Sequence, residues 1–128
     1  MLRIIFAPFV YSVFILTTTL WPSTVSGSEA VATQHAQVRI RNRQVIEPKT
    51  QRLVVTKNTL LNIRWHSDEA GTLHLHGYDI NVHLQANTTV SMQFLAKATG
   101  RFAVTSHGFA GETSHGHRAM LYIEVHPD

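Results

Sequence analysis

The 128-residue sequence contains no cysteine. The chain can therefore form no disulfide and has no thiol nucleophile, so its core must be stable without covalent cross-links. Charge is also scarce, because Asp, Glu, Lys and Arg make up only 15% of the residues and the formal net charge is +3. This mild excess of positive charge does not favour nucleic-acid binding, which normally requires dense clusters of Lys and Arg.

Amphipathic helices, internal repeats and recognisable catalytic motifs are missing as well. No serine or threonine lies in a nucleophile motif, and no glycine-rich phosphate loop follows a candidate strand. The sequence therefore gives no support to a hydrolase or a nucleotide-binding protein. The length leaves room for a single core of roughly 100 residues, so we expect one domain.

Residues 1–27 have the layout of a secretory signal peptide. Arg3 supplies a positive charge, and residues 4–20 contain no charged side chain. The small residues that follow predict cleavage after Gly27 or Ala30. The alternative is an uncleaved membrane anchor, because the uncharged run is at the short limit for a transmembrane helix. We expect an exported protein, periplasmic in a bacterium and otherwise secreted, or membrane-anchored if the signal is retained.

The remainder of the sequence alternates short strand patterns with turns. Residues 28–35 lack periodicity and predict a leader, which leaves 36–128 as the folded domain. About eight segments show period-two alternation or β-branched enrichment, which predicts an all-β sandwich. These segments are 38–41, 52–56, 60–66, 72–76, 80–84, 89–95, 100–106 and 120–126. The connection 106–119 contains three glycines, and connections of this length are frequently functional.

Nine histidines occur in the sequence, and five of them lie where a sandwich could gather them at one end. Two alternate on the predicted strand 72–76, so their side chains leave the same face. Three more, with a methionine, lie in or beside the long connection. Imidazole is a preferred ligand of copper and zinc, and a thioether favours Cu(I), so copper is the first expectation and zinc the second. The candidate ligands are His74, His76, His107, His115, His117 and Met120.

Several polar residues have alternative interpretations. The strand pair could be two histidines on a polar sheet face, and the other three could belong to a polar loop. His66, His83 and His126 are isolated in the sequence, so we expect them outside the metal site. Asp79 could orient a metal-bound imidazole by accepting its hydrogen bond, or it could simply form a turn.

Three arginines alternate at positions 39, 41 and 43. On a strand, this spacing puts the three cations on one face. A solvated strand face is the expected role, and a stripe that binds phosphate or lipid is the alternative.

A resemblance to cupredoxin-type domains is carried by three stretches: Asp68 to Asp79 with its His-Leu-His-Gly-Tyr-Asp core, Gly100 to His107, and His115-Gly116-His117 running into residues 121–127. It spans about residues 36–127 and is nearest to exported cupredoxin-like proteins that lack the blue-copper cysteine. The resemblance implies a Greek-key β-sandwich with a copper site at one end.

The same resemblance implies roles for the candidate ligands. His74 or His76 would stand for the family's strand histidine, and His107 falls where its cysteine closes the penultimate strand. His115 or His117 would stand for the loop histidine, and Met120 for the axial methionine. Without a thiolate the site would not be blue, so electron transfer is not the expected role.

The expected function is therefore exported copper binding, for delivery, storage or assembly, with a metal ion and a membrane or exported copper protein as partners. Two other functions stay open: a metal-free β-sandwich that acts as an interaction module, and a small copper oxidoreductase or dismutase. A weaker resemblance to copper-zinc superoxide dismutases rests on the His-x-His pattern followed by Gly-x-Asp. The cysteine pair of that family is absent from this sequence.

Overall fold

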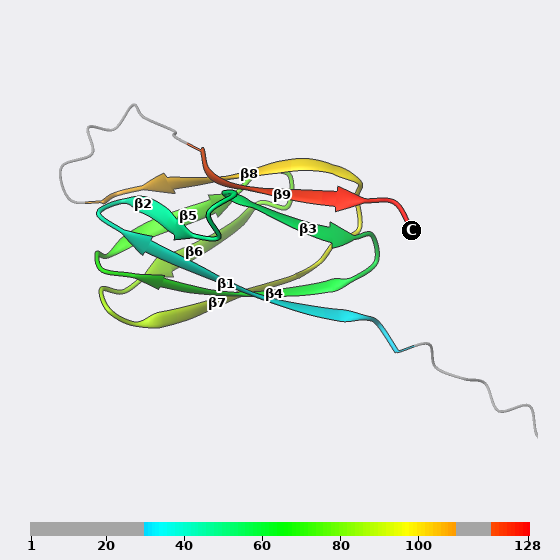
Figure 1. The fold of residues 1–128 in the computed structure, drawn as a ribbon, viewed down its shortest axis with the longest axis horizontal. Coiled ribbons are helices and arrows are strands. Elements are labelled where there is room, and N and C mark those ends of the chain that lie inside the picture. Colours follow the sequence, from blue (N-terminus) through cyan, green and yellow to red (C-terminus); the bar gives the residue numbers. More distant parts are fainter. Residues whose placement is uncertain (1–29, 110–118) are drawn as a thin grey trace, which may run out of the picture.

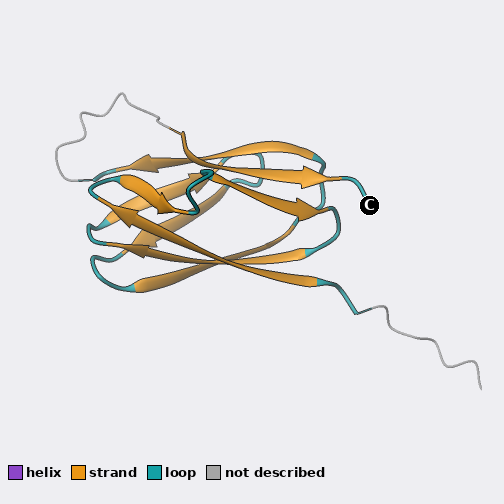
Figure 2. Cartoon of the chain, in the orientation of Figure 1, coloured by secondary structure: helices purple, strands orange, loops and turns teal. Residues whose placement is uncertain are grey.

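The computed structural model describes residues 30–109 and 119–128. Within these ranges the chain forms nine strands and no helix (Figures 1 and 2), which confirms the predicted all-β class. The strands are β1 (Thr33–Arg41), β2 (Gln44–Glu47), β3 (Arg52–Thr56), β4 (Leu60–Ser67), β5 (Gly71–Leu75), β6 (Ile80–Leu84), β7 (Thr89–Leu95), β8 (Gly100–His107) and β9 (Ala119–His126). This part of the chain has no helix long and apolar enough to cross a membrane.

The strands form two sheets that face each other (Figure 1). One sheet has four strands in the order β2-β1-β4-β7, and the other has five in the order β3-β9-β8-β5-β6. Most neighbouring strands are antiparallel, but β1 pairs with β4 and β3 pairs with β9 in parallel. Because both parallel pairs join strands that are distant in sequence, the chain crosses between the sheets, as a Greek-key sandwich requires.

Alternating side chains from both sheets fill the space between them. Leu61, Ile63 and Trp65 of β4 are fully buried, and so are Leu73 and Leu75 of β5. Each large apolar side chain buried in this way contributes roughly 1.5–3 kcal/mol. Since successive side chains of a strand point to opposite faces, these buried positions direct the residues between them to the outer faces of the sandwich.

The turn between β5 and β6 is tied to the rest of the fold by aromatic rings. Gly77 has a φ of +83°, and a Cβ at this position would lie 2.6 Å from Cδ1 of Phe102. The ring of Phe102 packs edge-on against Tyr78, with 4.9 Å between centroids, and Tyr78 contacts Phe94 at 4.6 Å. Phe102 lies in one sheet and Phe94 in the other, so the turn bridges the two layers.

The N-terminal edge of the domain differs from the predicted elements. β1 begins at Thr33, so His35 belongs to a strand and not to a leader. Its first residues have no apolar alternation, but they pair with the start of β4, and this backbone pairing keeps them extended. β2 was not predicted, because the turn before it is Asn42-Arg43, with φ of 49° and 61°, and lacks the usual Asn-Gly signal of a hairpin.

Arg43 is consequently a turn residue. It does not share a strand face with Arg39 and Arg41, contrary to the prediction from their spacing. Its Nε donates a hydrogen bond to Oε2 of Glu69 over 3.1 Å, which ties the β1–β2 turn to the β4–β5 connection.

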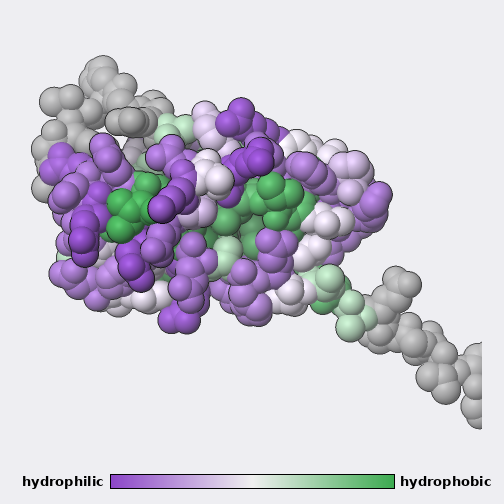
Figure 3. Space-filling model, in the orientation of Figure 1, coloured by the Kyte–Doolittle hydropathy of each residue, from purple (hydrophilic) through white to green (hydrophobic). Residues whose placement is uncertain are grey.

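The surface is mainly hydrophilic, as Figure 3 shows, with apolar side chains emerging on the face where β2 and β3 lie. Ile46 of β2 and Val54 of β3 are exposed by 37% and 43%. These strands are the edges of their sheets, and the two sheets are not hydrogen-bonded to each other at this side of the sandwich.

Candidate metal centre

Two of the candidate ligands lie together on the outer face of the five-stranded sheet. Leu73 and Leu75 point into the core, so the alternation of β5 turns His74 outward, and His76 directly after the strand leaves on the same side. The centroids of the two imidazole rings are 4.3 Å apart. The side chain of His74 is 24% exposed, and His76 is an exposed residue.

A third candidate comes from the neighbouring strand. β8 runs antiparallel beside β5, with Thr105 opposite His74 and His107 opposite Thr72. The rings of His74 and His107 are 6.4 Å apart. The structure therefore brings three candidate ligands together, on the outer face of a sheet and not at the end of the sandwich where the sequence had suggested a site.

The hydroxyl of Thr105 contacts the imidazoles of His76 and His107. Its hydroxyl oxygen lies 2.9 Å from Nε2 of His76 and 3.4 Å from Nε2 of His107, and the residue is only 5% exposed. A threonine hydroxyl has one proton to donate and can accept as well, so it can serve both rings at once. No sequence motif marked Thr105, although its spacing of two from His107 puts both on one face of a strand.

Asp79 orients His74 from the β5–β6 turn. Its Oδ1 accepts a hydrogen bond from Nε2 of His74 over 3.1 Å, which is the orienting contact that the sequence had suggested. Because a carboxylate can only accept, the neutral imidazole carries its proton on Nε2 and its lone pair on Nδ1. Asp79 itself is 95% exposed in its side chain and has a φ of 54°.

The imidazole pair fits a shared metal ion. Bonds from histidine nitrogen to metal are about 2.0–2.1 Å, so two nitrogens on one ion lie within about 4 Å of each other. The ring separation of 4.3 Å allows this for His74 and His76. Among residues 30–109 and 119–128, however, no three His, Cys, Asp or Glu side chains are grouped closely enough to hold an ion. The described residues thus supply two ligands, with His107 beside them.

The other candidates are placed differently. Met120 is 7% exposed and belongs to the hydrophobic core between the sheets. It is the extra residue in an irregularity of the β8–β9 ladder, where Thr105 pairs with Ala119 and Val104 with Leu121. His115 and His117 lie outside the described residues.

The three histidines expected outside the site are dispersed. His83 of β6 has its Nδ1 3.1 Å from the hydroxyl of Thr72. His126 has its Nε2 3.8 Å from a carboxylate oxygen of Glu124. His66 lies in the other sheet, in β4.

Elsewhere on this outer face, a small ion-pair network joins β3, β9 and β8. Glu124 lies 3.5 Å from Arg52 and 3.7 Å from Arg101, and its side chain is 19% exposed. The guanidinium of Arg101 also stacks over the ring of Tyr122, 3.8 Å from its centroid. The charges of Glu124, Arg52 and Arg101 therefore compensate one another.

The two-sheet arrangement is that of a cupredoxin-like domain, as the resemblance implied. A chain of a heme-copper terminal oxidase dimer matches 77% of this chain over 67% of its own length, with a TM-score of 0.62 and 22% identity. A copper-binding protein in its apo form matches 74% of this chain over 89% of its own, with a TM-score of 0.57 and 10% identity.

The periplasmic domain of subunit II of the cytochrome oxidase of Bradyrhizobium japonicum is also similar. It matches 73% of this chain over 84% of its own length, with a TM-score of 0.57 and 14% identity. No protein-family model and no curated protein matches the sequence. At these identities the likeness defines the fold, which is cupredoxin-like.

Proposed function

We propose that this protein is an exported copper-binding protein with a non-blue site, and that it serves copper delivery, storage or assembly. The observation that carries the proposal is the imidazole pair of His74 and His76. Their rings are 4.3 Å apart, and a hydrogen bond to Asp79 or to Thr105 holds the Nε2 of each. Within the described residues neither Nδ1 has a hydrogen-bond partner, so both lone pairs can be directed to one ion.

The chemistry of the donors supports copper as the cargo. Imidazole suits copper and zinc, and secondary hydrogen bonds to the distal nitrogens are the usual companions of metal-bound histidine. The chain has no cysteine, so the strong thiolate bond on which blue-copper electron transfer depends is not available. The exposed position of His76 favours an ion that is passed on over one that is enclosed.

The similarity of the fold to known copper proteins also supports this function. A copper-binding protein and a heme-copper terminal oxidase are among the similar structures. The periplasmic location of the similar oxidase domain supports export, which the N-terminal sequence also predicts. A membrane or exported copper protein is the corresponding partner for this chain.

The test is a copper titration with a matched histidine control. Isothermal titration with Cu(II) compares the chain from residue 28 with its His74→Ala/His76→Ala variant and with a His35→Ala/His126→Ala variant that also loses two histidines. We expect the first variant to lose at least about tenfold in affinity, because both ligands are removed, and the control to bind as the wild type does. Unchanged affinity in the His74→Ala/His76→Ala variant would show that these two histidines are not the copper site. Background binding by the wild-type chain would leave the metal-free interaction module as the better function.

A further inference from the structure

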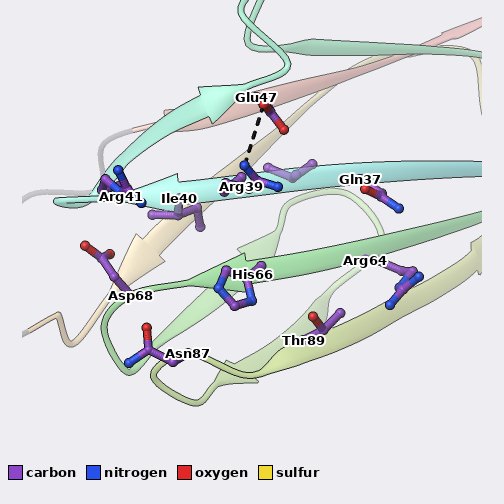
Figure 4. Close-up of a pocket in the computed structure, with 11 residues that line it drawn as sticks. Gln37, Arg39, Ile40, Arg41, Glu47, Arg64, His66, Asp68, Asn87 and Thr89 are labelled. Atoms are coloured by element: carbon purple, nitrogen blue, oxygen red, sulfur yellow. Dashed lines mark ion pairs between the residues drawn. The ribbon is translucent and has the colours of Figure 1, made fainter.

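A concave site lies on the four-stranded sheet, away from the histidine cluster formed by His74, His76 and His107. It is a pocket of about 320 Å³ over β1 and β4, bordered by the end of β2 and the start of β7. Figure 4 shows the side chains that line it. Small-molecule sites typically have volumes of roughly 300–1,000 Å³, so the pocket can hold a compact ligand.

The pocket gathers the positive charge of this sheet. Arg39 and His66 are direct neighbours in the parallel ladder of β1 and β4. Arg41 follows two residues after Arg39 on β1, and Arg64 precedes His66 by two on β4, so all four leave the same face. The backbone pairing of β1 with β4, the two central strands of this sheet, sets the positions of Arg39, Arg64 and His66 relative to one another.

Two carboxylates border the pocket, and both are already engaged. Oε1 of Glu47 lies 3.8 Å from Nη1 of Arg39. The two carboxylate oxygens of Asp68 accept from the backbone N–H of Asn42, at 3.2 and 3.0 Å. In the part of the chain that the structure describes, Arg41 and Arg64 form no ion pair.

Neutral donors complete the lining. Gln37, Asn87 and Thr89 each contribute a polar side chain, and Thr89 is the antiparallel partner of His66. Guanidinium groups present a planar fork of N–H donors that matches the oxygens of carboxylate and phosphate. The pocket therefore combines two guanidinium groups that form no ion pair among the described residues with hydroxyl and amide donors.

We propose that this pocket binds a small, multiply charged oxyanion, a molecule that carries phosphate groups or several carboxylates. Arg41 and Arg64 provide the charge, and Arg39, His66 and Thr89 lie between them in the lining (Figure 4). A flat anionic surface such as a membrane fits less well, because the site is concave and Glu47 stands at its border. The formal net charge of +3 is also small for a polyanion such as nucleic acid.

The proposal is independent of copper binding, because the pocket and the histidine cluster lie on different sheets and share no residue. Calorimetric titrations of the chain from residue 28, with no metal added, would use pyrophosphate and citrate in separate arms to distinguish phosphate from carboxylate ligands. Vesicles containing an anionic phospholipid form a third arm. We expect saturable binding of pyrophosphate, citrate or both that weakens at higher salt, and little binding to vesicles.

The variants separate the pocket from general charge. Arg41→Gln/Arg64→Gln should lower the anion affinity at least tenfold. Arg64→Lys should lower it less, because lysine keeps the positive charge but lacks the planar pair of guanidinium donors. Arg52→Gln/Arg101→Gln removes the same charge from the other sheet and should bind like the wild type. The proposal is overturned if neither anion binds saturably, if both double variants lose affinity equally, or if only vesicles bind. Thermal unfolding of each variant identifies any loss of affinity that comes from unfolding. If Arg41→Gln/Arg64→Gln does not fold, the affinity of Arg64→Lys tests the proposal instead, and an affinity equal to that of the wild type would overturn it.

Discussion

The hydroxyl oxygen of Thr105 lies 2.9 Å from Nε2 of His76, between neighbouring strands of the five-stranded sheet. Thr105 is 5% exposed, so this contact is shielded from water and persists better than a hydrogen bond between exposed side chains. It makes the orientation of an exposed imidazole depend on a residue inside the sheet, and the same hydroxyl reaches His107.

Thr105→Val should weaken copper binding without removing any ligand. Valine keeps the shape of the side chain but cannot hold the Nε2 atoms, and losing such a contact typically costs about 10–100-fold in metal affinity. Thr105→Ser keeps the hydroxyl and should retain most of the affinity. Competition with a chromophoric copper chelator measures both variants, and equal affinities for valine and serine would contradict the positioning role of Thr105.

Asp79→Asn should lower the copper affinity by a smaller factor, about tenfold. The amide is neutral, so it orients the Nε2–H of His74 less strongly than a carboxylate does. Asparagine tolerates the left-handed backbone at this position, where φ is 54°, so the turn should remain intact. The same chelator competition gives the affinity, and a thermal melt should be unchanged. A variant that binds copper as tightly as the wild type would assign Asp79 to the turn alone.

Gly77→Ala should destabilise the fold more than Gly108→Ala does. Both glycines have positive φ, at 83° and 71°, but only at Gly77 would a Cβ collide with Phe102, whereas nothing described lies within 4 Å of a Cβ at Gly108. The expected loss at Gly77 is more than about 1 kcal/mol. In a domain of this size, each kcal/mol lowers the Tm by about 4–8 °C. Equal shifts in Tm would show that backbone strain alone is responsible.

A chain that begins at residue 36 should be less stable than one that begins at residue 30. The shorter chain loses Thr33–His35, which pair with the start of β4, and the hydrogen bond from the N–H of Leu60 to the carbonyl of Ala32 at 2.8 Å. Each such bond contributes about 0.5–1.5 kcal/mol, so the difference should exceed about 1 kcal/mol. Urea unfolding measures it, and a chain from residue 28 is the control that should match residue 30. Equal urea midpoints for the chains that begin at residues 36 and 30 would show that residues 30–35 act as a leader and do not stabilise the domain.

Strand alternation carried most of what the sequence could predict. Successive side chains of a strand point to opposite faces, so the apolar Leu73 and Leu75 alternate with His74 and His76. This alternation was enough to predict that the two histidines share a face, without knowledge of the fold. The eight predicted strands are all present. The ninth strand, β2, is short and follows the turn Asn42-Arg43. This residue pair does not predict the left-handed backbone that both residues adopt.

The histidine cluster was harder to predict because it depends on register. Only the pairing of β5 with β8 puts Thr105 opposite His74, and a shift by one residue would have turned Thr105 into the core. The basic pocket likewise depends on the parallel ladder that sets Arg39 beside His66. Spacing within one segment predicted that Arg39 and Arg41 share a face, but partners from other strands could not be identified from it.

The position of β9 in the sheet has a consequence for how the chain folds. β9 is the last strand in the sequence, yet it lies between β3 and β8. Its side chains Leu121, Ile123 and Val125 are at most 2% exposed, so the core is incomplete without them. The core cannot be completed until β9 has been synthesised, and the long-range pairing of β3 with β9 makes closure slow. The strands that precede β9 therefore lack a complete core until this last strand of the domain pairs with them.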